Sequence, residues 1–395
     1  MPRFEINKKT QNMFGMDFVQ LLDTETGQRA TVYNQGSSLQ ELVLRYSGNL
    51  VNVVYGHQDY ADFLEGIPRL DLPRIDPFSL FDSSCIPKEA EAINQRDSDV
   101  GRFAEAQRLM RKYPAWAGAA FLGLANRIYK GQGVILHPET KAVLNAMNFP
   151  VNHEESNSFI HGNEMKNDAE LIHTEVNDKY ALVVMKQKIG IGLEAFPEGV
   201  FNFTAYRLAP EGLNEIGCVM NLGIEYAPVT VGRHSSYRIG KEGIEDHELH
   251  ICSTGSLEVD EVKNPTGRVI PDVSRGRSHV IHDLAHESLD NTYLIMPKVP
   301  IILTNKTRGY GLSLEATDNE TRMVTCWTHE LPEKVAGNYH RQFAAIEFLA
   351  AGHSAMLSLP LQLDVRTIPP ELQQRVLAPD EALHYARKFR PVVYK

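Results

Sequence analysis

Short apolar segments separated by turn sequences run along most of this chain and restrict its fold more than any other feature. They are rich in β-branched and aromatic residues, which favour strands. Clear examples are residues 51–55, 181–185, 201–206 and 301–303. Turn sequences rich in proline, glycine and asparagine lie between them, as at residues 210–212, 264–267 and 307–309. Regularly spaced short strands without intervening helical patterns predict an all-β sandwich or barrel.

Residues 64–116 interrupt this series of strands. The segment is first rich in proline, and residues 100–110 then carry apolar side chains at roughly helical spacing. We therefore expect a single β-sandwich domain over residues 1–395, with a proline-rich and partly helical insertion at residues 64–116. Two interpretations of the insertion remain open: a surface element that covers a sheet edge, or a lid or partner surface near a site.

Composition and charge narrow the functional classes. The formal net charge is -10 and the pI about 5.9, which argues against a nucleic-acid partner because phosphate backbones select basic surfaces. No apolar stretch is long enough for a membrane-spanning helix, and the first residues carry no secretory signal. The four cysteines form no C-x-x-C pair and are typical of reduced thiols. These features predict a cytoplasmic monomer or homodimer that handles a small molecule.

Three motifs resemble known cofactor or catalytic signatures but fail in detail. The glycines of residues 190–195 imitate a dinucleotide fingerprint, yet Pro197 breaks the helix that such a motif must open. The sequence of residues 247–250, H-E-L-H, is one residue too short for the zinc motif H-E-x-x-H. Residues 352–356 lack the closing glycine of a hydrolase nucleophile elbow. We expect neither a cofactor nor a metal ion.

Several polar residues lie instead in apolar, strand-like surroundings and are the candidate site residues. They are Asn126, Arg127, His161, His234, Asp290 and Glu347. Each alone is more often a satisfied structural group or a solvated one than a catalyst. Together they supply two imidazoles, two carboxylates and a guanidinium, which is sufficient for acid/base chemistry on a hydroxylated ligand.

The order of the surrounding motifs resembles the aldose 1-epimerase (galactose mutarotase) family. The matching segments are residues 34–36, 123–131, 161–162, 195–199, 232–237, 259–260, 265–267, 346–347 and 377–385, with Tyr206 at the end of a strand and His250 at the start of another. No single segment is specific, but the ordered set covers nearly the whole chain outside the insertion. The resemblance implies a large β-sandwich whose concave face binds an aldose.

The resemblance also implies roles for the candidate residues. Glu347 would be the base and His234 the acid of a cofactor-free ring opening and closure that interconverts the α and β anomers of a hexose. His161 would hold the ring oxygen or an adjacent hydroxyl. Asn126, Arg127 and Asp290 would bind further parts of the sugar through hydrogen bonds. Trp116 and Trp327 are candidates for an apolar face against the sugar, although a core position is expected for both.

The sequence departs from the family pattern around both catalytic candidates. Arg233 stands where an asparagine usually precedes the histidine, one extra serine follows His234, and residues 348–352 differ after the glutamate. Two alternatives therefore stay open. One is a non-catalytic carbohydrate-binding or regulatory protein on the same fold. The other is a phosphosugar 1-epimerase in which Arg233 and Arg238 clamp a phosphate.

Overall fold

The structure is a computed structural model of the chain. It describes residues 2–9, 17–56, 120–122, 124–152, 157–162, 167–194, 196–240, 243–261, 263–272, 279–328, 343–350, 369, 372–373 and 375–394. The predicted insertion at residues 64–116, with Trp116, and the motif at residues 352–356 lie outside this part of the chain.

The N-terminal strands form a five-stranded antiparallel sheet in chain order. These strands are β1 (Phe4–Lys9), β2 (Phe18–Asp23), β3 (Arg29–Tyr33), β4 (Ser38–Tyr46) and β5 (Asn49–Asn52). The strand predicted at residues 51–55 therefore ends early, at Asn52. Beyond it, Val54 makes an isolated bridge with Tyr237, which ties the end of this sheet to the rest of the molecule.

A second, much larger antiparallel sheet contains most of the remaining strands. Its order is β11 (Glu170–Val176), β12 (Ala181–Lys188), β13 (Val200–Ala209), β14 (Gly212–Asn221), β27 (Ala382–Val393), β23 (Tyr310–Ala316), β22 (Ile301–Asn305), β18 (His247–Val259), β21 (Asp290–Ile295), β24 (Thr321–Thr328), β25 (Ala344–Ala350), β16 (Val231–Arg233) and β6 (Ala120–Leu122). Three more strands join it at its sides: β17 (Ser236–Tyr237) on β25, and β19 (Pro265–Pro271) and β20 (His279–Asp283) on β18. The strands predicted at residues 181–185, 201–206 and 301–303 are confirmed within it.

Three small two-stranded sheets complete the described strands. They are β7 (Arg127–Tyr129) with β10 (Ser158–Ile160), β8 (Gln132–Leu136) with β9 (Val143–Asn148), and β15 (Ala227–Val229) with β26 (Arg375–Leu377). The 3-10 turn η4 (Ile244–Asp246) precedes β18. No α-helix occurs in the described residues. This part of the chain therefore contains no helix long and apolar enough to cross a membrane.

The long strand β18 joins the two halves of the large sheet. Residues 247–250 pair with β22, whereas residues 253–256 pair with β21, and the register shifts between Ser253 and Gly255. Such a bulge bends a strand and lets it serve two parts of a sheet. The bend brings β21, β24 and β25 into one group of strands that carries the candidate site.

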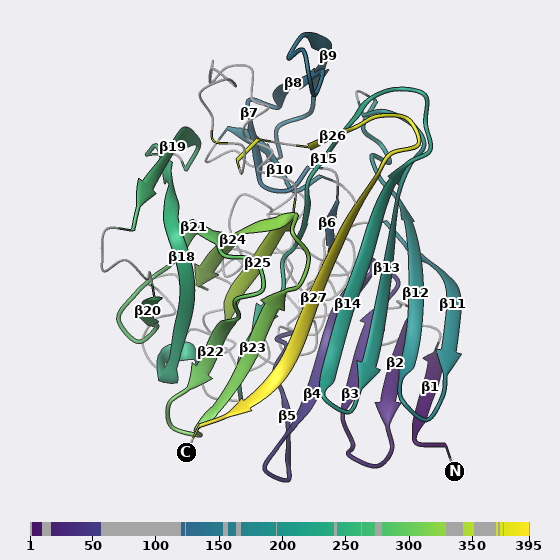
Figure 1. The fold of residues 1–395 in the computed structure, drawn as a ribbon, viewed down its shortest axis with the longest axis vertical. Helices are drawn as coiled ribbons and strands as arrows, with labels where there is room; N and C mark the ends of the chain where they lie inside the picture. The colour runs from purple at the N-terminus through teal and green to yellow at the C-terminus, as the bar shows by residue number, and fades with distance from the viewer. Residues whose placement is uncertain are drawn as a thin grey trace, which may run out of the picture.

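The N-terminal sheet packs against β11, β12, β13 and β27, which makes the two layers of a sandwich (Figure 1). Strands β12 and β13 alternate between buried and partly exposed residues, except at the end of β13 where Leu208 and Ala209 are both buried, as the period of two of a half-buried strand predicts. The core between the layers includes Leu21, Leu42, Val183, Tyr206 and Leu208. The predicted all-β sandwich is confirmed.

Candidate active site

Three neighbouring strands, β21, β24 and β25, form the floor of the candidate site. Their register places two rows of side chains on one face: Asp290, Trp327 and Ala345 in the first, and Thr292, Thr325 and Glu347 in the second. The two threonine hydroxyls lie 2.8 Å apart and bond to each other. On the opposite face of β25, Ile346 and Phe348 belong to the hydrophobic core. Glu347 therefore projects away from the core from a strand that is buried along its whole length.

His234 reaches Glu347 from a break between two short strands that both pair with β25. Between β16 and β17 the N–H of Ser235 donates to the carbonyl of Arg233 at 2.8 Å, a γ-turn centred on His234. The N–H of Ile346 then donates to the carbonyl of Ser235 at 3.0 Å, which fixes this turn beside Glu347. As a result His234 Nε2 lies 3.1 Å from Glu347 Oε1, with the side chains 7% and 3% exposed.

His161 and Asn126 lie at the ends of the small sheet β7–β10 and hold each other in place. Both have left-handed backbones, with φ of 63° and 67°. The N–H of His161 donates to the carbonyl of Asn126 at 3.0 Å, and the N–H of Asn126 donates to His161 Nδ1 at 3.3 Å. Because Nδ1 is an acceptor, the neutral ring carries its proton on Nε2. The His161 ring centre is 6.0 Å from that of His234, at a near-perpendicular angle.

Electrostatics distinguish Glu347 from an ordinary carboxylate. Burial raises the pKa of Glu347 well above its usual 4.5, the negative charge of Asp290 raises it further, and the positive charge of Arg127 opposes both. Among the described residues Glu347 Oε2 has no hydrogen-bond partner, although it is buried. Lys263 Nζ lies 3.5 Å from Asp290 Oδ2 and adds a second positive charge at the rim. A buried carboxylate in these surroundings holds a proton more readily than one in water.

The structure thus gathers all six candidate residues. His234 and Glu347 are in contact, and the ring of His161, which is bonded to Asn126, lies beside that of His234. Arg127 and Asp290 act on Glu347 through their charges. Their catalytic and sugar-binding roles remain predictions.

Trp327 differs from the expected core position. It is half-buried on the same face as Glu347, and its ring meets His234 at 6.0 Å and 67°. Sequence reasoning also missed Thr292, Thr325 and Lys263, which only the strand register and a turn bring to the site. The one sequence signal for Thr325 was its position two residues before Trp327, because side chains two residues apart on a strand lie on the same face.

The alternative in which Arg233 and Arg238 clamp a phosphate does not fit the position of Arg233, which is 1% exposed. Its Nε donates to Glu215 Oε1 at 2.8 Å and its Nη1 to the carbonyl of Ser37 at 2.7 Å. The guanidinium is therefore committed to the protein interior. The described residues also contain no group of three or more histidine, cysteine, aspartate or glutamate side chains placed to hold a metal ion.

Comparison with known proteins identifies the family of the chain. A family model described as aldose 1-epimerase matches residues 95–350, and the chain belongs to that family. No curated protein matches the sequence.

Several solved structures share the fold over almost the whole chain. A galactose mutarotase-like protein from Clostridium acetobutylicum is 14% identical, with a TM-score of 0.68 and coverage of 99% of each chain. An aldose epimerase homologue from C. elegans is 15% identical, with a TM-score of 0.63 over 96% of this chain and 100% of that one. The galactose 1-epimerase of Lactobacillus acidophilus is 13% identical, with a TM-score of 0.62 and full coverage of both chains. At these identities the likeness shows the fold.

Proposed function

We propose that this protein is an aldose 1-epimerase that interconverts the α and β anomers of a hexose. The observation that carries the proposal is the contact between His234 and Glu347, 3.1 Å apart and almost completely buried on the face that also carries Asp290 and Trp327. Mutarotation opens the pyranose ring, turns the aldehyde end and closes the ring on its other face. It needs one base for the C1 hydroxyl and one acid for the ring oxygen, and both are present in this pair.

The proposed reaction needs one transferable proton in this pair. A neutral Glu347 beside a neutral His234 contains as many protons as a carboxylate beside an imidazolium, so transfer across the 3.1 Å contact interconverts the two forms. In the ionised form Glu347 takes the proton of the C1 hydroxyl while His234 donates to the ring oxygen. Ring closure reverses both transfers. The raised pKa of Glu347 makes its carboxylate a stronger base than a solvated glutamate.

The neighbouring groups suit a sugar that lies between this pair and the small sheet β7–β10. His161, protonated on Nε2, donates to the ring oxygen or to an adjacent hydroxyl. Asp290 accepts from a hydroxyl and Arg127 donates to one through charge-assisted hydrogen bonds. The half-buried ring of Trp327 offers an apolar surface for the C–H face of the sugar.

Polarimetry of freshly dissolved α-glucose and α-galactose tests the proposal directly. Purified protein should speed the approach to the equilibrium rotation of at least one sugar in proportion to enzyme concentration. A variant of an exposed glutamate, Glu225→Gln, is the matched control and should keep the full rate. Saturable sugar binding without any acceleration would overturn the proposal and support the non-catalytic binding protein.

A further inference from the structure

Two threonine hydroxyls lie beside the proposed base and take no part in the acid/base chemistry. Thr325 on β24 is the cross-strand partner of Glu347, and Thr292 on β21 is the partner of Thr325. The hydroxyls are 2.8 Å apart, and the two residues are 8% and 7% exposed. We propose that this hydroxyl pair recognises the C2 hydroxyl of the sugar and so selects aldoses that carry it. The proposal rests on the proposed mutarotase function and adds a specificity-determining contact to the same site.

The register of the sheet places the threonines on one side of the base. Cross-strand partners on one face of a sheet have their β-carbons about 4.5–5.5 Å apart. Thr325 and Glu347 are such partners, so the Thr325 hydroxyl lies next to the carboxylate on the side of β24. His234 contacts the same carboxylate from between β16 and β17, which pair with the other edge of β25. Glu347 therefore lies between a histidine and the hydroxyl pair.

The order of atoms in a pyranose relates these two neighbours to two parts of the sugar. C1 carries the reacting hydroxyl and is bonded within the ring to the ring oxygen and to C2. The proposed mechanism places C1 at Glu347 and the ring oxygen toward His234. C2 then lies on the other side of C1, toward β24. The polar side chains that the row of Glu347 offers on that side are Thr325 and Thr292.

The threonine pair has hydrogen-bonding capacity left for a ligand. One hydroxyl donates to the other, which leaves one hydroxyl proton and several lone pairs. In the described part of the chain, this mutual contact is the one hydrogen bond that the two side chains make. A sugar hydroxyl both donates and accepts, so it matches what remains. A site that pairs its buried polar groups with a substrate hydroxyl discriminates against an analogue that lacks this hydroxyl.

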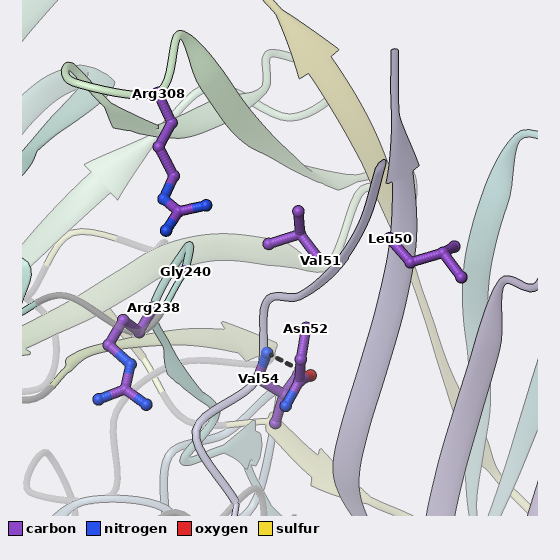
Figure 2. A pocket seen from close by; sticks show the side chains of 7 residues that line it. All are labelled: Leu50, Val51, Asn52, Val54, Arg238, Gly240 and Arg308. Atoms are coloured by element: carbon purple, nitrogen blue, oxygen red, sulfur yellow. Dashed lines mark hydrogen bonds between the residues drawn. The ribbon is translucent and has the colours of Figure 1, made fainter. Parts of the chain in front are cut away.

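A separate pocket provides a control for where the sugar binds. Its described lining includes Leu50, Val51, Asn52, Val54, Arg238, Gly240 and Arg308 (Figure 2). Strands β21, β24 and β25 contribute none of these residues. Tyr55, under Arg238, stacks on Phe343, and Phe343 packs against Trp327. Tyr55 and Phe343 are each 1% exposed, so packed rings lie between this pocket and the site.

Isothermal titration calorimetry of galactose against 2-deoxygalactose, and of glucose against 2-deoxyglucose, tests the contact without relying on turnover. For at least one pair, wild-type protein should bind the sugar about tenfold more tightly than its 2-deoxy form. Thr325→Val keeps the shape of the side chain but removes the hydroxyl. It should weaken binding of the sugar to about the level of the 2-deoxy form and leave binding of the 2-deoxy form nearly unchanged. Thr325→Ser keeps the hydroxyl and should keep the preference, and Thr292→Val should lower it by a smaller factor.

Thr304→Val is the matched control, because Thr304 is also 8% exposed but lies on β22, outside the site. Neither this variant nor Arg308→Gln, which changes the separate pocket, should alter the ratio of the two affinities. An altered ratio in Arg308→Gln would overturn the proposal, because the sugar would then bind in that pocket. An unchanged ratio in Thr325→Val, or equal weakening of both sugars, would also overturn it.

The wild-type protein alone keeps the test decisive if a variant does not fold. Equal binding of each sugar and its 2-deoxy form, or no saturable binding of any of the four, would overturn the proposal. The proposed function fails differently. Discrimination at C2 without any acceleration of mutarotation would overturn the proposed function alone, whereas acceleration with equal binding of both forms would overturn the C2 contact alone.

Discussion

Two glutamates are buried in the described part of the chain, and their surroundings differ in an instructive way. Glu215 on β14 is 1% exposed and lies between two guanidinium groups, with Arg233 at 2.8 Å and Arg387 at 3.5 Å. Glu347 on β25 is 2% exposed, contacts the imidazole of His234 and has the negative Asp290 nearby. The first carboxylate is therefore paired with two permanent positive charges. The second contacts an imidazole instead, and its pKa is raised by burial and by Asp290.

This difference separates a structural carboxylate from one suited to catalysis. Removing one partner from an ion pair such as that of Glu215 lowers stability strongly, because the remaining charges are then buried without compensation. A carboxylate whose pKa is raised by burial is destabilising when ionised but is a better base. Burial alone therefore does not identify a functional carboxylate. The groups that contact the carboxylate distinguish a structural role from a catalytic one. The following predictions test this contrast from the largest expected effect to the smallest.

Glu215→Gln should cause the largest loss of stability. It leaves Arg233 and Arg387 buried beside a neutral amide, and breaking a buried pair in this way costs about 3–5 kcal/mol. Urea unfolding followed by circular dichroism measures the change. The exposed control Glu225→Gln should stay within about 0.5 kcal/mol of the wild type. If Glu215→Gln were as stable as this control, the ion pair would not hold β14 and β16 together.

Glu347→Gln should have the opposite profile, a large loss of activity with an intact fold. The amide keeps the shape of the side chain but cannot accept the C1 proton, so the mutarotation rate should fall by about a hundredfold or more. His234→Asn should act similarly. The double variant should be far less impaired than the product of the two effects, because acid and base act as a unit. Polarimetry measures the rates, and an unchanged rate in Glu347→Gln would contradict the assignment of the base.

Local sequence patterns were sufficient to predict much of the fold. Strands β12, β13 and β22 follow the β-rich segments of the sequence closely, because alternation and turn residues are local signals. The course of β18 was not predictable in this way. Its change of partner from β22 to β21 depends on which strands lie on either side of it, and this is decided only when the whole sheet assembles.

The candidate site likewise combines features that the sequence predicts with contacts that only the assembled sheet determines. The resemblance of ordered motifs led to His234 and Glu347, and the structure places them in contact. It could not reveal that Arg233, the immediate neighbour of His234, faces the core and pairs with Glu215. Nor could it place Trp327 beside His234. Both contacts join residues far apart in the sequence, and their formation depends on pairing across the sheet.

The pH dependence of stability should also report on the burial of Glu347. The folded-state pKa of Glu347 is raised, so its contribution to stability is fully present below the usual value of 4.5 and is lost as pH rises through the folded-state value. Glu347→Gln imitates the protonated form and removes this dependence. The variant should match the wild type in acid and become the more stable protein at higher pH. Urea midpoints of both proteins from pH 4 to 9 measure the difference, and parallel curves would contradict it.

The smallest effects should come from the charges that surround Glu347. Asp290 raises the pKa of Glu347, so Asp290→Asn should move the acidic limb of the pH–rate profile to lower pH. Lys263 lies 3.5 Å from Asp290 and offsets part of its charge, so Lys263→Met should move the same limb to higher pH. Both partners are partly exposed, at 44% and 33%, and such pairs contribute little, so Lys263→Met should change the optimal rate by less than about fivefold.

These opposite shifts give the sharpest test of how Glu347 differs from Glu215. On the proposed mechanism the field of its neighbours tunes a carboxylate that exchanges a proton during the reaction, whereas Glu215 lies between two guanidinium groups and takes no part in it. Polarimetric rates between pH 4 and 9 for the two variants provide the measurement, and raising the salt concentration should shrink both shifts because the rim charges are partly exposed. Shifts in the same direction would mean that the acidic limb reports a group other than Glu347. The base would then have to be sought elsewhere on the face that β21, β24 and β25 form.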